Sequence, residues 1–200
     1  MPKTQGNQIV KVFDEALIYD AGVESVDSLV RTVSSKVLVV EARHGAVFDQ
    51  ISWLLASGAT TIHLLGHGKP GQVELAGCVL DGDAWESIIL MSDRMLHHGE
   101  NKLCSSKNEK SVSRCGEFAE SEQELEINFW SCQTGVGDMG KEYIQRVANL
   151  CDARVNASSS LVGHKKLGGN WELDVMSYPR VPFSQSARDG FEQVLAHDGV

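Results

Sequence analysis

A histidine and a cysteine in this chain each follow a short apolar segment that is typical of a buried strand. Residues 60–65 (TTIHLL) lead into Gly66-His67-Gly68, and residues 125–130 (LEINFW) lead into Ser131-Cys132. In an open parallel sheet, ligands and catalytic groups gather beyond the carboxyl ends of the strands. Two neighbouring strands that end in this way would bring an imidazole and a thiol to the same rim. These are the two groups that catalysis by a cysteine nucleophile with a histidine base requires.

The surroundings of these two residues suggest a role for each. Cys132 precedes a glycine-bearing turn, residues 133–138, and then a predicted helix. The positive end of such a helix would lower the pKa of the thiol from its ordinary value of about 8.5. Amides of the turn could bind an oxyanion, and Gly68 permits close backbone approach and offers one more N–H. We expect Cys132 to be the nucleophile, His67 the general base and acid, and the amides of Gly68 and Cys132 the oxyanion hole.

Each residue taken alone has a simpler interpretation. A cysteine after a strand is more often a packing residue and a histidine in a turn is more often solvated, so only their joint placement favours a catalytic pair. His44-Gly45 follows another predicted strand and competes with His67 for the role of base, but it ranks second because no sharper turn follows it. The other histidines lie in a strand (His63), at a helix end (His97, His98), in a loop (His164) and in the tail (His197).

The apolar pattern around these residues predicts a parallel α/β domain. Strands are expected near residues 16–20, 36–41, 60–65, 125–130 and 153–157. Segments with apolar residues at helical spacing alternate with them, which is the mark of a parallel sheet with right-handed crossovers. The unbroken apolar run Val37–Val40 suits a sheet that is covered on both faces. We therefore expect a mostly parallel sheet with helices on both faces.

The pattern changes after His67. Residues 72–75 and 78–80 predict a hairpin, and a helix is expected from Asp81 onward. Residues 99–123 form a polar stretch with few large apolar side chains, which is typical of a functional loop or a disordered insertion. Because this stretch offers little apolar surface to offset its ordering entropy, we expect it to be mobile and to be nicked first by proteases.

The ends of the chain carry weaker patterns. Residues 171–175 alternate like an edge strand, and the two prolines after Ser177 precede no strong pattern. We therefore expect residues 1–15 to be a linker, residues 16–176 the domain, and residues 177–200 a C-terminal tail.

Composition limits the classes of function. The 200-residue chain has a formal net charge of −9 and no Lys/Arg-rich stretch, so the electrostatic footprint of a nucleic-acid-binding protein is missing. No apolar run reaches the ~18 residues of a membrane span. Residues 1–15 lack the apolar core of a secretory signal. The protein is expected either in the cytosol or as a segment of a longer exported chain.

The cysteine count argues against a disulfide framework and against a structural zinc site. There are five cysteines and no CxxC pair: Cys78, Cys104, Cys115, Cys132 and Cys151. An odd number without paired spacing fits neither a disulfide scaffold nor a zinc site. Thiol chemistry needs no metal or other cofactor. A bond between Cys104 and Cys115 in an oxidising setting has no other support in the chain.

At these residues the sequence resembles the DUF4347 family. Residues 62–77 (IHLLGHGKPGQVELAG), 127–140 (INFWSCQTGVGDMG) and 157–173 (ASSSLVGHKKLGGNWEL) follow the family's blocks in order, within a likeness that spans about residues 16 to 176. The family is found mainly in large bacterial surface or secreted proteins. Its pattern is similar to that of caspase-like (clan CD) cysteine peptidases, whose dyad is a His-Gly and a Cys after successive strands. The resemblance implies a caspase-hemoglobinase α/β fold with the dyad at His67 and Cys132.

Two features depart from the family pattern. Residues 99–123 replace a short connection, and Ser131 stands where the family has a glycine before the cysteine, which would narrow the rim. An acidic substrate side chain would need a basic partner near the rim. Lys69, Lys165 and Lys166 are all candidates for that partner.

Three functions follow in order of preference. The first is a caspase-like cysteine endopeptidase that acts on its own polypeptide or on a tethered neighbour. The second is a non-catalytic module in which the same rim binds a peptide or a partner. Thiol reactivity separates the two, because a working dyad makes Cys132 alkylate far faster than the other cysteines. A flavodoxin-like nucleotide binder ranks last, since residues 20–23 (DAGV) lack a phosphate-cradling glycine run and Gly66-x-Gly68-x-x-Gly71 matches the dinucleotide fingerprint by spacing alone.

Overall fold

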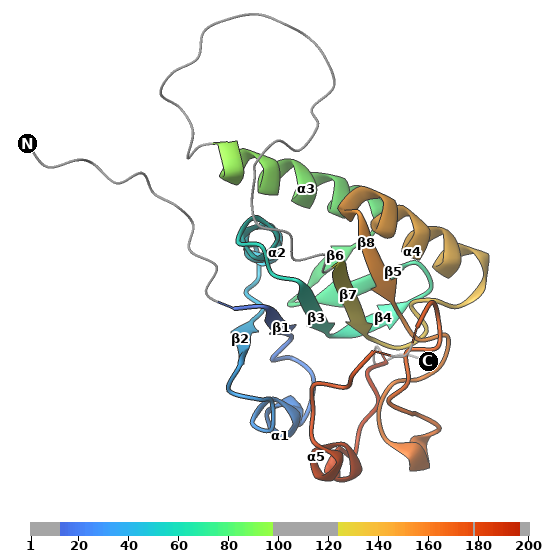
Figure 1. The fold of residues 1–200 in the computed structure, drawn as a ribbon. Coiled ribbons are helices and arrows are strands. Elements are labelled where there is room, and N and C mark those ends of the chain that lie inside the picture. The colour runs from blue at the N-terminus through green and yellow to red at the C-terminus, as the bar shows by residue number, and fades with distance from the viewer. Residues whose placement is uncertain (1–12, 98–123, 178, 197–200) are drawn as a thin grey trace, which may run out of the picture.

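A five-stranded parallel sheet forms the centre of the molecule (Figure 1). The computed structural model describes residues 13–97, 124–177 and 179–196. The sheet has the order β2-β1-β3-β7-β8, and every neighbouring pair is parallel. Its strands are β1 (Glu15–Tyr19), β2 (Val37–Glu41), β3 (Thr61–Leu65), β7 (Leu125–Trp130) and β8 (Ala153–Asn156). All five predicted strands are therefore confirmed, and so is the mostly parallel sheet. The predicted mobile insertion, with Cys104 and Cys115, lies outside the described residues.

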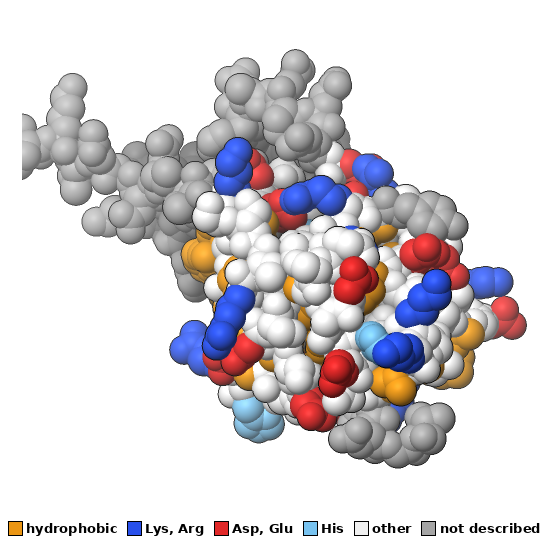
Figure 2. Space-filling view, turned by 90° about the horizontal axis from the view of Figure 1, so that it is seen from below, with side chains coloured by type: hydrophobic (Ala, Val, Ile, Leu, Met, Phe, Trp, Pro, Cys, Tyr) orange, Lys and Arg blue, Asp and Glu red, His pale blue; other side chains and the backbone are white. Residues whose placement is uncertain are grey.

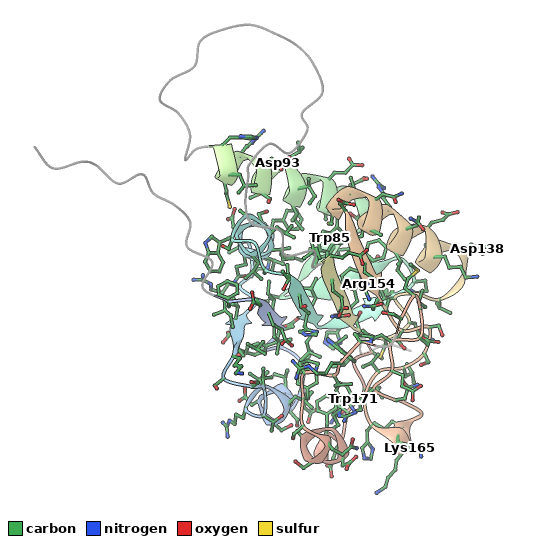
Figure 3. The ribbon with its side chains drawn as sticks, viewed as in Figure 1. Trp85, Asp93, Asp138, Arg154, Lys165 and Trp171 are labelled. Atoms are coloured by element: carbon green, nitrogen blue, oxygen red, sulfur yellow. The ribbon has the colours of Figure 1, made fainter. Side chains whose placement is uncertain are left out.

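Three helices cover one face of this sheet. They are α2 (Val47–Ala56), α3 (Gly82–His97) and α4 (Gly137–Cys151), and Figure 1 shows α3 and α4 running above the strands. Trp85 lies between α3 and the sheet (Figure 3), where it is 1% exposed and donates from Nε1 to the Tyr143 hydroxyl at 2.9 Å. The Tyr143 hydroxyl in turn donates to the Leu80 carbonyl at 2.7 Å. This buried chain of hydrogen bonds fixes α3 and α4 to the strand before α3. No helix in the described part of the chain has the length and apolar character to cross a membrane.

The opposite face is covered by two short helices and by irregular chain. The helices are α1 (Val26–Val30) and α5 (Gln185–Gly190), which lie below the sheet in Figure 1. Seen from below in Figure 2, charged side chains of both signs are interspersed over this face. The predicted sheet with helices on both faces is thus present, although most of the lower cover is loop.

The C-terminal segment differs from the tail that its pattern suggested. Phe183, Phe191 and Leu195 are at most 4% exposed and belong to the lower core. Trp171, which lies between the sheet and α5 in Figure 3, contacts Phe183 and Phe191 with ring centroids 5.6 and 5.5 Å apart. Phe183, Phe191 and Leu195 lie in irregular chain on either side of α5, where no helical or strand period marks the residues that face inward. A search of the sequence for helical or strand periodicity therefore does not identify these three as core residues.

The predicted edge strand at residues 171–175 is also not formed. Only one isolated bridge joins Val175 to Ala157, with the Val175 amide donating to the Ala157 carbonyl at 3.0 Å. The neighbouring backbone amides form hydrogen bonds with side chains instead. Asn170 accepts the Glu172 amide at 2.8 Å, and Asp174 accepts the Ser159 amide at 2.7 Å. Such local side-chain bonds compete with sheet pairing.

A second, antiparallel sheet follows β3 directly. It contains β4 (His67–Lys69), β5 (Gln72–Leu75) and β6 (Cys78–Leu80) in that order. The hairpin of β5 and β6 and the helix after it are confirmed, whereas β4 was not predicted. A Cβ on Gly66 would overlap the Glu74 carbonyl oxygen, so a glycine is needed where the chain leaves one sheet for the other.

A buried histidine ties the two ends of the domain together. His63 is 1% exposed, and its Nδ1 accepts a hydrogen bond from Trp130 Nε1 at 3.0 Å. Because an indole N–H can only donate, the imidazole proton lies on Nε2, which is 3.0 Å from a carboxylate oxygen of Glu15. Arg180 donates to the same carboxylate at 2.7 and 2.9 Å. His63 is therefore a satisfied core histidine.

The acid sensitivity of the protein should fall when Glu15 is replaced by Gln. The hydrogen bond with His63 is the main cause that lowers the pKa of Glu15 below its ordinary 4.5, with the charge of Arg180 assisting and burial opposing. A carboxylate with a lowered pKa stabilises the fold fully above its unfolded pKa, and this contribution is lost as the pH falls through its folded pKa. Urea denaturation at about pH 6 and about pH 3 should show a larger loss of stability for wild type than for Glu15→Gln. Equal losses of stability in the two proteins would contradict the stabilising role of the ionised Glu15 carboxylate.

Candidate functional site

His67 and Cys132 stand at the same edge of the parallel sheet. Leu65 of β3 pairs with Trp130 of β7 in the last rung of the ladder. The Gly66 amide then donates to the Trp130 carbonyl at 3.2 Å. His67 and Cys132 therefore each lie two residues beyond this last pair of residues. The structure brings the two backbone positions together at the carboxyl edge, where ligands of such sheets bind.

Gly68 packs directly against the backbone beside Cys132. A Cβ added to Gly68 would lie 2.5 Å from the Cys132 carbonyl oxygen and 2.6 Å from the Thr134 hydroxyl. The two hydroxyls of Ser131 and Thr134 are 2.6 Å apart, and the Gly71 amide donates to the Thr134 carbonyl at 3.1 Å. These contacts fasten the β4–β5 hairpin to the turn that follows Cys132. The Ser131 and Thr134 hydroxyls were not predicted to belong to the site.

The thiol of Cys132 is buried and held by backbone groups. The residue is 1% exposed. Its sulfur accepts the Val162 amide at 3.2 Å and donates to the Val162 carbonyl at 3.6 Å. Burial raises the pKa of Cys132 to about 11, against a smaller lowering by the amides of Val162 and Leu195. In this conformation the sulfur is a neutral thiol.

The predicted lowering of the Cys132 pKa by the following helix is therefore wrong. Cys132 packs in the lower core, whereas α4 contributes Tyr143, Ile144 and Val147 to the upper core. The helix and the sulfur lie on opposite faces of the sheet, so the positive helix end does not act on the thiol. Cys132 lies in the turn after β7, which ends at Trp130, and this turn directs the thiol into the lower core.

The turn after Cys132 also uses its amides internally. The amides of Gln133 and Gly135 donate to the carbonyls of Ser160 and Ser158, each at 2.9 Å, and the Val136 amide donates to the Gln133 carbonyl at 3.1 Å. These three groups are not available to an oxyanion. The assignment of the Gly68 and Cys132 amides to an oxyanion hole stays a prediction.

The positions of the two candidate bases favour His67. His67 is half-buried in β4, directly after the strand that neighbours β7. His44 follows β2, three strands away from β7, which is about 14 Å at a spacing of about 4.8 Å per strand. The His44 ring is also engaged, since its Nδ1 lies 3.0 Å from the Ala76 carbonyl oxygen.

Neither a metal centre nor a phosphate cradle is visible among the residues that the structure describes. No group of three or more His, Cys, Asp or Glu side chains there is placed to hold a metal ion. The first turn after β1 is occupied by the carboxylate of Asp20, which accepts the amides of Gly22 and Ala76, each at 2.7 Å. A nucleotide phosphate would have to displace this internal anion.

A cavity beside the site does not include the dyad. It measures about 740 Å³ and carries charges of both signs: Lys165, Lys166, Arg188, Glu172 and Asp189. Lys165 points away from the body of the molecule in Figure 3. Lys69 is exposed on β4.

A short segment of irregular chain lies across Cys132 at residues 193–196, where the sequence pattern is only weakly helical and no helix forms. The Leu195 amide donates to the Val162 carbonyl at 2.8 Å, and the His164 amide donates to the Gln193 carbonyl at 2.8 Å. Isolated bridges join Val194 to Gly163 in antiparallel fashion and Ala196 to Gly68 in parallel fashion. Residues 193–196 therefore lie between the loop after β8 and β4. We call this stretch the covering segment.

Comparison with known proteins gives a family without an assigned activity. The family model described as a domain of unknown function, DUF4347, matches residues 16–195. No curated protein and no solved structure matches the chain. The matched region takes in β1, the two candidate residues and the buried Phe183, Phe191 and Leu195. By this match over most of its length, the chain belongs to the DUF4347 family.

Proposed function

We propose that this domain is a caspase-like cysteine endopeptidase of the caspase-hemoglobinase type, with His67 and Cys132 as its catalytic dyad. The observation that carries the proposal is the register of β3 and β7, which places both residues two positions beyond the Leu65–Trp130 rung. The close approach of Gly68 to the Cys132 carbonyl supports it, because a base must come within hydrogen-bond reach of its nucleophile.

The proposed reaction needs no group beyond the chain and water. His67 takes the proton of the Cys132 thiol, and the thiolate attacks the scissile carbonyl carbon while the amides of Gly68 and Cys132 receive the oxyanion. When the tetrahedral intermediate collapses, the C–N bond breaks and His67 gives its proton to the leaving amine. Water, deprotonated by His67, then cleaves the thioester, which releases a carboxylic acid and restores the thiol.

The described conformation supports a latent form of such an enzyme. A thiol with a pKa of about 11 is almost fully protonated near neutral pH, and the thiolate is the nucleophile. The covering segment and Val162 also close the approach to the sulfur. Activity therefore requires that the covering segment leave. Because that segment is part of the chain, the polypeptide itself is the first expected substrate.

A non-catalytic peptide-binding module is the second candidate. The observation that favours it is the covering segment, which reaches the rim through backbone pairing on two sides. Addition of an extended peptide to exposed backbone is a common mode of peptide recognition. The buried Cys132 would then be a packing residue.

Three substitutions separate the two candidates. Cys132→Ser should abolish cleavage of the chain and of added polypeptides, and His67→Ala should reduce it nearly as much, since residues that act as one unit are not additive. His44→Ala is the matched control and should change the rate little, because its ring bonds Ala76. The measurement is the rate at which new N-termini form, read by mass spectrometry. Cleavage that survives Cys132→Ser would exclude the dyad, and no cleavage in any variant would favour the binding module.

A further inference from the structure

We infer that the rim is a groove for one extended polypeptide strand with a large apolar side chain at a single position, and that residues 193–196 are its resident occupant. This inference rests on the proposed function, since it names the class of polypeptide that would lie across Cys132. Four kinds of contact carry it: backbone pairing, glycine clearance, one buried side chain and the position of the sulfur.

Backbone groups on both walls of the groove pair with the covering segment. On one wall, Val162 accepts the Leu195 amide and His164 donates to the Gln193 carbonyl, both at 2.8 Å. On the other wall, Ala196 bridges Gly68 of β4. Backbone pairing of this kind is largely independent of sequence and gives affinity to any extended strand.

Two glycines clear the path of the covering segment. Gly163 has a φ of +133°, and a Cβ there would lie 2.7 Å from the Val194 Cα. A Cβ on Gly169 would lie 3.0 Å from Cγ1 of Val194. A side chain at Gly163 would also be strained by its backbone conformation. The wall is thus shaped for close approach of another backbone.

One side chain of the covering segment is selected by the groove. Leu195 is 0% exposed and belongs to the lower core together with Cys132 and Val162. Gln193 and Val194 are half-buried, and Glu192 before them is exposed. The groove therefore selects an apolar residue at the Leu195 position and tolerates variation before it. Val162, which accepts the Leu195 amide, also donates its own amide to the Cys132 sulfur at 3.2 Å, so Leu195 lies next to Cys132 in the lower core.

The covering segment is held by few contacts for a strand. Its pairing consists of isolated bridges, whereas β3 and β7 share five paired residues. Segments with few backbone bonds open at a lower free energy than the whole domain. Hydrogen exchange of the wild-type protein should show the Leu195 amide exchanging well before the amides of β3 and β7. Exchange of all of them in one step would overturn the role of an exchangeable occupant.

Peptide binding tests the groove without cleavage. In a Cys132→Ser variant that also carries Leu195→Asp, the charge should expel the covering segment, and a labelled peptide of residues 191–196 (FEQVLA) should bind saturably by fluorescence polarisation. The same peptide with Asp at the Leu195 position should bind about 10- to 100-fold more weakly. Leu195→Met in the protein is the matched control, because Met fits the site and should keep the groove filled.

The outcomes separate this inference from the proposed function. Circular dichroism first establishes that the Leu195→Asp variant is folded, and if it is not, the hydrogen-exchange measurement on wild type decides. A folded variant that binds neither peptide overturns the inference, and equal binding of both peptides overturns the apolar preference. Selective binding together with no cleavage by the Cys132-containing protein would leave the groove standing and exclude the peptidase.

Discussion

Cys132 in the folded wild-type protein should react with iodoacetamide about 100-fold more slowly near pH 7 than the same residue in the denatured chain. Burial raises the pKa of Cys132 to about 11, roughly two units or more above that of a free thiol, and each unit lowers the thiolate fraction tenfold. The thiolate is the reactive form, so the rate should follow that fraction. Because the pKa lies far above neutrality, the rate should also rise about tenfold for each pH unit up to about pH 11. Quenched samples, digested and read by mass spectrometry at the Cys132 peptide, give the rate directly.

Cys151, which is also buried, provides the control for this measurement. Burial also raises the pKa of Cys151, to about 12, and Cys151 lies in α4 in the upper core, away from the covering segment. Leu195→Asp should speed the alkylation of Cys132 while leaving Cys151 slow. Fast alkylation of wild-type Cys132 that disappears in His67→Ala would instead mean that the dyad is already assembled in the resting protein.

Phe191→Ala should lower the free energy of unfolding by about 3–5 kcal/mol, the usual cost of removing a fully buried aromatic side chain. Phe191 is 0% exposed and packs edge-on against Trp171 at 5.5 Å. Because the free energy of unfolding of an ordinary domain is about 5–15 kcal/mol, this single substitution would remove a large part of the stability of the fold. Urea denaturation followed by circular dichroism measures the effect.

A matched exposed residue completes this test. Met176 is 66% exposed, and Met176→Ala should change the free energy of unfolding by no more than about 0.5 kcal/mol. If residues 179–196 were a tail, Phe191→Ala would behave in the same way. A loss below about 1 kcal/mol for Phe191→Ala would therefore contradict the packing of this segment on the lower face.

The sequence predicted the parts of the molecule that follow a period. The five strands of the parallel sheet are short segments rich in apolar residues, most clearly in the unbroken run Val37–Val40, and segments with apolar residues at helical spacing alternate with them. Once β3 and β7 are neighbours, the positions of His67 and Cys132 at one edge follow from the strand ends alone. This is why the candidate pair could be found without coordinates.

The burial of Cys132 could not be predicted in the same way. The Cys132 sulfur is bonded by Val162, which in turn accepts the Leu195 amide. These two residues lie 30 and 63 positions further along the chain. Both belong to irregular segments in which no apolar period marks the residues that face inward. Cys132 itself lies in the turn after β7, where no strand period predicts the face to which the sulfur points.

The two glycines on either side of His67 allow the structural and the chemical demands on this short segment to be separated by mutagenesis. Any side chain at Gly66 would overlap the Glu74 carbonyl, and one at Gly68 would overlap the Cys132 carbonyl. Both positions should reject every substitution in a saturation library that is selected for folding alone. His67 between them is half-buried on a three-residue strand and should accept many residues in that selection. If the selection for folding admits other residues at this position and a selection for activity retains only histidine, the difference between the two libraries reports chemistry.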